Sequence, residues 1–192
     1  MDDITLFVAT GDLKEQTINV LKTVFKFNDM DELNWLLGIQ KTFTDDGITL
    51  SQKTFIDKIL NRFSKPHWKP ISKTIDSNHQ LKAIKDKDEC TDATAYQQII
   101  GSSMYLVTGT RSDLAYTITH LSQVNSSPSP KHLTAAKRVL RYLQETKDSH
   151  LFYLWNNQLK KTAYTDASYA KCLDMRRSFC GYIFQLGNAT VS

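Results

Sequence analysis

Residues 131–146 read KHLTAAKRVLRYLQET and carry the clearest periodic pattern in the chain. Four apolar residues recur at helical spacing and form one stripe: Leu133, Ala136, Leu140 and Leu143. Three basic residues lie away from that stripe: Lys137, Arg138 and Arg141. An apolar stripe opposite a charged face is typical of a helix that packs on a core. The segment therefore predicts a surface helix from Lys131 to Thr146, entered through the sequence Ser127-Pro128-Ser129-Pro130.

Further helices are predicted before this segment, and strands are predicted after it. Helical spacing recurs in three earlier segments: Lys53–Phe63, Tyr96–Val107 and Asp113–Val124. Prolines and polar residues between Ser64 and Asp92 indicate a long loop or linker. After Asp148, four short segments read as strands: Leu151–Trp155, Lys161–Thr165, Gly181–Leu186 and Ala189–Val191.

The N-terminal part of the chain predicts a mixture of strands and one helix. Ile4–Ala9 and Trp35–Lys41 read as strands, and a helix between them runs through Phe25. Asp45-Asp46-Gly47 is a turn sequence, so Ile48–Leu50 is expected to return as a hairpin. The fold class is therefore α+β, with short mixed sheets at the two ends and helices between them.

Composition sets the class of protein. The 192 residues are 41% hydrophobic and 23% charged, with a net charge of +4, which is typical of a folded domain that tolerates a polyanionic partner. No apolar run approaches the ~20 residues that cross a bilayer, so no membrane partner is expected. The three cysteines show no metal-binding spacing, and an odd count without a secretion signal favours the cytoplasm or nucleus.

Most of the candidate functional residues have two interpretations. Asp2 and Asp3 read as a solvated chain end, and Asp166, just past a strand-like segment, reads either as a site acid or as a turn or helix cap. Lys137, Arg138 and Arg141 form either a solvated helix face or a strip that follows a phosphate backbone.

The order of motifs resembles the Pol region of copia-type LTR retrotransposons over nearly the whole chain. The resemblance rests on Met1-Asp2-Asp3, Trp35-Leu36-Leu37-Gly38-Ile39, Gly47-Ile48-Thr49-Leu50-Ser51-Gln52-Lys53, Gly101-Ser102-Ser103-Met104-Tyr105-Leu106, Thr110-Arg111-Ser112-Asp113-Leu114-Ala115-Tyr116, Ala135–Leu143 and Tyr164-Thr165-Asp166-Ala167-Ser168-Tyr169-Ala170. Each motif is moderately specific, and their ordered succession is much more so.

The resemblance implies a division of the chain and a role for each acid. Residues 1–50 would be the C-terminal part of a reverse transcriptase palm, and 51–147 a helical thumb and connection with a polar linker near 64–92. Residues 148–192 would be the first strands of an incomplete ribonuclease H-like domain. Asp2 and Asp3 would bind Mg²⁺ in the polymerase site, and Asp166 would be the first metal-binding carboxylate of the ribonuclease H site.

Several of the family's site residues have no counterpart in these 192 residues. The first palm aspartate would lie upstream of Met1, and the remaining ribonuclease H acids beyond Ser192. We therefore expect a fragment derived from an RNA-directed DNA polymerase with ribonuclease H activity, inactive alone and without stably bound Mg²⁺. Its expected partners are RNA, DNA or RNA–DNA hybrids, bound weakly and non-specifically, and missing parts of the Pol polyprotein. The alternatives are a non-catalytic nucleic-acid-binding remnant and a pseudogene product without a selected function.

Overall fold

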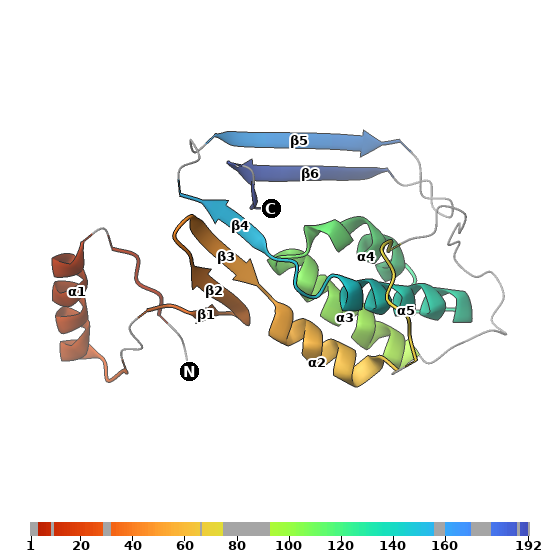
Figure 1. Ribbon diagram of the computed structural model, residues 1–192, viewed down its shortest axis with the longest axis horizontal. Coiled ribbons are helices and arrows are strands. Elements are labelled where there is room, and N and C mark those ends of the chain that lie inside the picture. The colour runs from red at the N-terminus through yellow and green to blue at the C-terminus, as the bar shows by residue number, and fades with distance from the viewer. Residues whose placement is uncertain are drawn as a thin grey trace.

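The protein combines five α-helices and one 3₁₀ turn with two antiparallel sheets in the residues that the computed structural model describes (Figure 1). These are residues 4–8, 10–28, 32–65, 67–74, 93–155, 160–169, 178–187 and 189–191. The α+β class predicted from the sequence is confirmed. The described sheets are antiparallel rather than mixed, because most neighbouring strands follow one another through short connections, which suit antiparallel pairing.

The first sheet is built from four short strands in the order β1-β2-β3-β4. Their bounds are β1 Trp35–Leu36, β2 Ile39–Phe43, β3 Gly47–Ser51 and β4 Leu151–Leu154. The expected hairpin is present, with Phe43 paired to Ile48. The continuous strand expected over Trp35–Lys41 is wrong, because Leu37 and Gly38 turn the chain with φ values of 49° and 71°. The Tyr105 hydroxyl donates to the Leu37 carbonyl and holds this turn against the helices.

The helices pack into one bundle that contains most of the buried apolar residues. Their bounds are α2 Lys53–Phe63, α3 Ala93–Gly109, η1 Ser112–Leu114, α4 Ala115–Ser122 and α5 Pro130–Glu145. The core of the bundle includes Ile56, Tyr96, Ile100, Leu106, Leu114, Ile118, Val139 and Leu140. The Tyr96 hydroxyl donates to the Leu121 carbonyl over 2.7 Å, so this buried polar group has a partner. Among the described residues, no helix is long and apolar enough to span a bilayer.

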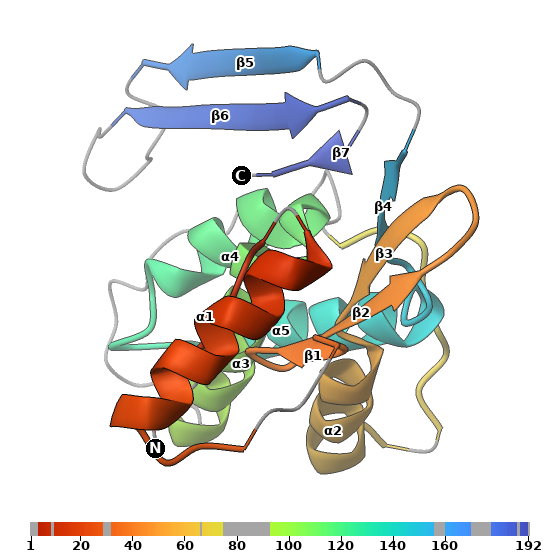
Figure 2. The same ribbon diagram turned by 90° about the vertical axis from the view of Figure 1, so that its left-hand side faces the viewer.

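The second sheet lies above the helices in Figure 2 and has the order β5-β6-β7. Its strands are β5 Lys161–Ser168, β6 Phe179–Leu186 and β7 Ala189–Thr190. The Tyr153 hydroxyl of β4 donates to the Thr190 carbonyl over 2.6 Å, which joins the two sheets. Many side chains of this sheet are exposed, including Tyr164, Tyr182 and Phe184.

The helical bundle is an insertion between two neighbouring strands of the first sheet. The chain leaves β3 for α2, and it returns from α5 into β4, which pairs with β3. Lys53 at the start of α2 forms an ion pair with Asp148, just before β4, at 2.5 Å. Strand β4 thus belongs to the sheet of the N-terminal hairpin and not to the sheet β5-β6-β7. In sequence, however, β4 lies in the segment 148–192, together with β5, β6 and β7.

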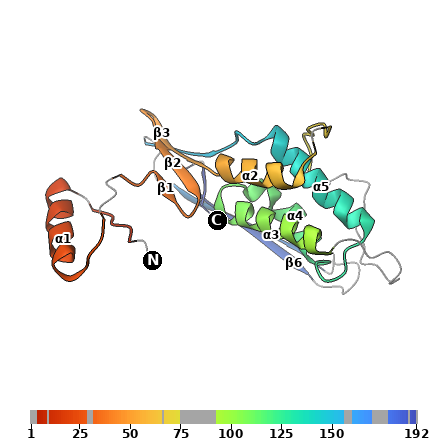
Figure 3. The ribbon, with the colours of Figure 1, turned by 90° about the horizontal axis from the view of Figure 1, so that it is seen from below.

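Helix α1, Gly11–Val24, stands apart from the rest of the molecule (Figure 3). None of its residues, all of which are described, is buried. The strand predicted over Ile4–Ala9 is wrong for residues 4–8, which form no regular structure, and Ala9 lies outside the described residues. An apolar run becomes a strand only where another strand pairs with it, and the described residues supply none here.

Candidate nucleic-acid interface

Helix α5 begins with a reciprocal cap that fixes where its faces point. The Ser129 hydroxyl accepts from the His132 N–H at 3.3 Å, and the Ser129 N–H donates to His132 Nδ1 at 3.1 Å. Pro130 occupies the first turn, where a missing N–H costs no hydrogen bond. The buried face consists of His132, Ala136, Val139, Leu140 and Leu143. Leu133, expected in that stripe, is only partly buried at its margin.

Two of the three basic residues of α5, Arg138 and Arg141, contact a segment that lies against the helix. The Arg141 Nε donates to the Lys69 carbonyl at 2.7 Å, and the Arg138 Nε donates to the Lys73 carbonyl at 3.2 Å. The Ile71 N–H donates to the Arg141 carbonyl at 3.4 Å. We call residues 67–74 the strap. Two arginines of α5 therefore bind the strap, and the strap brings the backbone of Lys69 and Lys73 next to this side of α5.

The far end of the strap is attached to a different helix. The Thr117 hydroxyl of α4 donates to the Thr74 hydroxyl at 2.9 Å. The strap is consequently attached to both α5 and α4, which fixes the backbone of Lys69 and Lys73 beside Arg138 and Arg141. We call these five residues the basic face: Lys69, Lys73, Lys137, Arg138 and Arg141.

A buried arginine orients the C-terminal end of α5. Arg111, only 2% exposed, donates to both carboxylate oxygens of Asp113 at 3.0 and 2.8 Å. It also donates to the Thr146 carbonyl at 3.1 Å and to the Thr146 hydroxyl at 2.6 Å. Because the last carbonyls of a helix lack partners within the helix, this guanidinium caps the end of α5.

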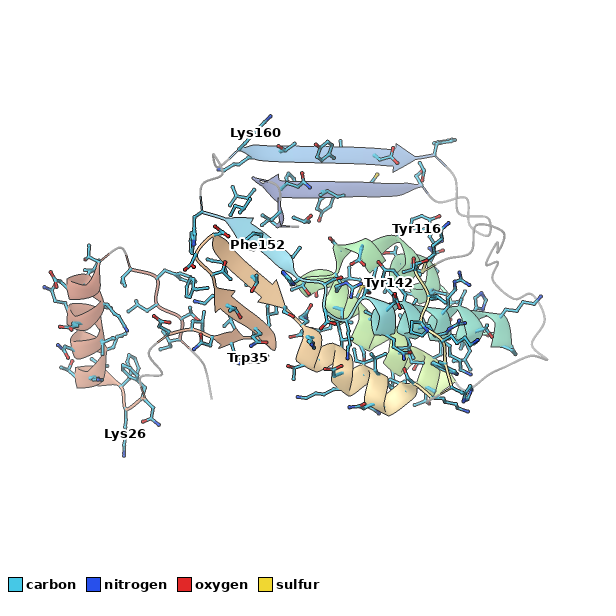
Figure 4. The ribbon with its side chains drawn as sticks, in the orientation of Figure 1. Lys26, Trp35, Tyr116, Tyr142, Phe152 and Lys160 are labelled. Atoms are coloured by element: carbon cyan, nitrogen blue, oxygen red, sulfur yellow. The ribbon has the colours of Figure 1, made fainter. Side chains whose placement is uncertain are left out.

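Tyr142 completes this network from α5 itself. Its hydroxyl donates to Asp113 Oδ2 at 2.8 Å, and its ring lies 5.5 Å from the Arg111 guanidinium (Figure 4). Burial raises the pKa of Asp113, but the hydrogen bonds and charge of Arg111 outweigh burial, so the pKa lies below its ordinary value. Burial and the bond to Asp113 raise the pKa of Tyr142. Asp113 is therefore an anion that belongs to the scaffold.

The predicted metal-binding acids are not brought together in the described structure. Asp2 and Asp3 lie outside the described residues. Asp166 lies exposed within β5, opposite Gly181 of β6. The described residues contain no group of three or more His, Cys, Asp or Glu side chains placed to hold a metal ion. A catalytic metal pair needs several oxygen ligands, so the described residues do not fit one, and no metal-dependent step follows from them.

Sequence reasoning missed the strap lysines and the role of Arg111. Lys69 and Lys73 fall in a segment that reads only as a polar linker, and nothing local indicates their contact with α5. The sequence Arg111-Ser112-Asp113 did carry a signal, since an arginine and a carboxylate two residues apart at a helix start are suited to pair. The other two hydrogen bonds of Arg111 go to Thr146, which is distant in sequence and which no local pattern indicates.

Comparisons with known proteins place the chain in a family. It is 34% identical over 192 residues to the retrovirus-related Pol polyprotein from transposon RE1 of Arabidopsis thaliana, covering 100% of this chain and 13% of the relative. It is 28% identical over 200 residues to that from transposon TNT 1-94 of Nicotiana tabacum, covering 15% of the relative. An uncharacterized mitochondrial protein of Arabidopsis thaliana is 30% identical over 192 residues, and the chain spans 79% of its length.

The chain thus spans about an eighth of the RE1 polyprotein, and the alignment to each of these relatives includes all of its residues. No family model matches the chain. No solved structure matches it either. The whole-chain identity to transposon polyproteins agrees with the resemblance carried by the ordered motifs. The chain belongs to the family of retrovirus-related Pol polyproteins from transposons.

Proposed function

We propose that the chain is the part of a retrotransposon Pol polyprotein that runs from the reverse transcriptase palm, through a helical thumb and connection, into ribonuclease H. Support comes from the order of the motifs and from the order of the elements, in which a hairpin precedes a helical bundle and a further sheet follows it. The parent activities would be RNA-directed DNA synthesis and cleavage of RNA in RNA–DNA hybrids. The whole polyprotein would use Mg²⁺ for both.

For the chain by itself, the proposed function is non-specific binding to the phosphate backbone of nucleic acids. The observation that carries it is the basic face, where hydrogen bonds to Arg138 and Arg141 place the strap lysines beside α5. Each arginine donates to the strap through Nε, so that bond does not use its Nη groups. Lys and Arg side chains contact phosphates without reading bases, so the binding should tolerate any sequence.

The size of the electrostatic effect follows from the number of phosphate contacts. Three to five contacts on a duplex imply a log–log salt slope of about −3 to −4.5. Such binding is weak at physiological salt, with dissociation constants of roughly 10⁻⁴–10⁻⁶ M. Fluorescence anisotropy of a labelled RNA–DNA hybrid, repeated at several salt concentrations, measures both quantities.

The test variant must remove charge without releasing the strap. Lys69→Glu/Lys73→Glu/Lys137→Glu meets this requirement because Arg138 and Arg141 keep their bonds to backbone carbonyls. The matched control, Lys14→Glu/Lys22→Glu/Lys26→Glu, makes the same charge change on and beside the separate helix α1. We expect the first variant to bind at least tenfold more weakly with a shallower slope, and the control to change affinity less than about threefold. Equal losses in both variants, or no loss in the first, would refute a specific role for the basic face.

A further inference from the structure

The strap carries one serine, Ser72, and it lies between the two arginines that bind the strap. On one side of it the Ile71 N–H donates to the Arg141 carbonyl at 3.4 Å. On the other side the Lys73 carbonyl accepts from Arg138 Nε at 3.2 Å. Figure 1 shows the strap, in yellow, beside α5. The backbone of Ser72 is therefore held within the basic face.

The hydroxyl of Ser72 is open to chemistry. Its side chain is exposed, and the described structure gives the hydroxyl no hydrogen-bond partner. The residue lies at a bend outside any helix or strand. A segment held by a few hydrogen bonds can open locally while the bundle stays folded. A modifying enzyme can consequently reach Ser72 in the folded protein.

A charge pattern distinguishes Ser72 from most hydroxyl residues of the chain. Lys69 lies three positions before it, and a positive charge at a fixed distance from a hydroxyl is a feature that the acidic substrate groove of a kinase can recognise. In the described parts of the chain, the serines and threonines that have a lysine or arginine three positions earlier are Thr17, Thr44, Ser72 and Thr134.

The three threonines of this set have hydroxyls that are bonded. Each donates to a nearby backbone carbonyl, over 2.7 Å in Thr17, 3.0 Å in Thr44 and 2.9 Å in Thr134. Thr17 and Thr134 also lie within α1 and α5, where the backbone cannot extend along a substrate groove. Of the four, Ser72 alone combines an unbonded hydroxyl with an irregular backbone.

We propose that Ser72 is a phosphorylation site and that its phosphate turns off nucleic-acid binding by the basic face. The enzyme is a serine/threonine kinase with acidic side chains that bind Lys69. Ser72 Oγ attacks the γ-phosphorus of ATP, the bond from that phosphorus to the bridging oxygen breaks, and ADP leaves with the electron pair. The hydroxyl proton passes to the catalytic base of the kinase. The inference rests on the proposed function, because the phosphate changes the binding proposed there.

The effect on binding follows from the charge of the phosphate. Phosphoserine carries a charge of about −1.5 to −2 at pH 7. Arg138 and Arg141 bind the strap through Nε, which leaves their Nη groups to donate charge-assisted hydrogen bonds to the phosphate. The phosphate therefore neutralises about two of the positive charges of the basic face and repels the phosphates of a nucleic acid.

The test places the same chemical group at two positions. One chain carries phosphoserine at position 72, and its matched control carries phosphoserine in place of Gln16, an exposed residue of the separate helix α1. Fluorescence anisotropy with a labelled RNA–DNA hybrid measures affinity at several salt concentrations. We expect phosphoserine at position 72 to weaken binding at least tenfold and to make the log–log salt slope shallower by about 2. The control should change affinity less than about threefold.

Phosphorus NMR gives a reading that needs no nucleic acid. The two arginines should hold the second pKa of the phosphoserine at position 72 below that of the phosphoserine at position 16, because nearby positive charges favour the dianion. Equal pKa values in the two chains would show that the phosphate does not bind the basic face, and would overturn the proposal.

A kinase reaction tests the modification itself. The unmodified chain is incubated with ATP and a purified serine/threonine kinase that requires a basic residue three positions before its acceptor, and mass spectrometry locates the phosphate. We expect Ser72 to be the main acceptor and Lys69→Gln to lower its labelling at least about fivefold. Lys65→Gln, the matched control, should change labelling less than about twofold. Labelling mainly at another residue, or none at Ser72, overturns the proposal.

Failure of this inference is distinguishable from failure of the proposed function. If the unmodified chain binds the hybrid equally well after charge reversal at Lys69, Lys73 and Lys137, the proposed function is refuted, and the switch with it. If binding depends on those lysines but phosphoserine at position 72 leaves the affinity unchanged, only the switch is refuted.

Discussion

Replacing Arg111 with methionine should destabilise the protein more than any other single charge removal in the bundle. The side chain is buried, and it makes four hydrogen bonds that tie η1 to the end of α5 through Asp113 and Thr146. Methionine has a similar length and fills much of the space without creating a large cavity. The change therefore isolates the loss of the charge and its hydrogen bonds.

The magnitude follows from what remains after the substitution. Removing one partner of a buried ion pair typically costs about 3–5 kcal/mol, because the other charge is left uncompensated. The Asp113 side chain is 41% exposed and keeps its bond to Tyr142, so water stabilises part of its charge. We therefore expect the lower limit, about 3 kcal/mol, which is a large fraction of the stability of an ordinary domain.

Urea unfolding followed by circular dichroism measures the effect at pH 7. Arg62→Met is the control, since the exposed Arg62 only donates to Gln98 and lies over the Phe63 ring in the described structure, and its loss should cost less than about 0.5 kcal/mol. Arg111→Met/Asp113→Leu should recover much of the loss, because it leaves no lone charge. An Arg111→Met protein as stable as the parent, or a double variant that is much less stable than the single, would refute this account.

The acid dependence has a definite sign. The pKa of Asp113 is lowered in the folded protein, so its ionised form stabilises the fold at pH values above the unfolded pKa of about 4. That contribution is lost as the pH falls through the lower, folded pKa. The stability difference between the parent and Arg111→Met should consequently shrink as the pH falls below about 4, through the lowered pKa of Asp113. A difference that stays constant over this range would contradict the pairing with Asp113.

Three further outcomes are expected. Ser129→Ala should lower the free energy of unfolding by about 1 kcal/mol through loss of the α5 cap, whereas Thr134→Ala on the exposed face should change it little. Leu140→Ala should cost about 2–5 kcal/mol, because it opens a cavity at a fully buried position. The isolated chain should neither extend a primed RNA template nor cleave an RNA–DNA hybrid with Mg²⁺, and hybrid cleavage that Asp166→Asn abolishes would refute this.

The sequence predicted the elements whose stability is local. The helix expected at Lys53–Phe63 matches α2 at both ends, because its apolar spacing alone defines a face that fits the bundle. The strand expected at Ile4–Ala9 failed because a strand depends on a partner that the run itself does not contain. The interruption at Gly38 was missed, although glycine is the residue that most readily adopts its positive φ.

The candidate site was predictable in outline and not in detail. Helical spacing correctly grouped Lys137, Arg138 and Arg141 on one side of α5. That spacing could not indicate that two of these residues bond to a strap more than sixty positions earlier in the chain. Charged residues are usually exposed, so periodicity likewise assigned no inward role to Arg111. Long-range hydrogen bonds of this kind carry no local pattern.

The pairing of β3 with β4 has a consequence for how the chain reaches its fold. The two strands are separated by roughly 100 residues, and closing an unstructured loop of that length costs about 4 kcal/mol in chain entropy. The intervening bundle removes much of this cost once it forms, since α2 and α5 then pack in one core and bring the ends of the two strands together. During synthesis the ribosome releases β3 long before β4. The hairpin edge thus stays open until the bundle has folded, and this interval is when a nascent chain is most exposed to mispairing.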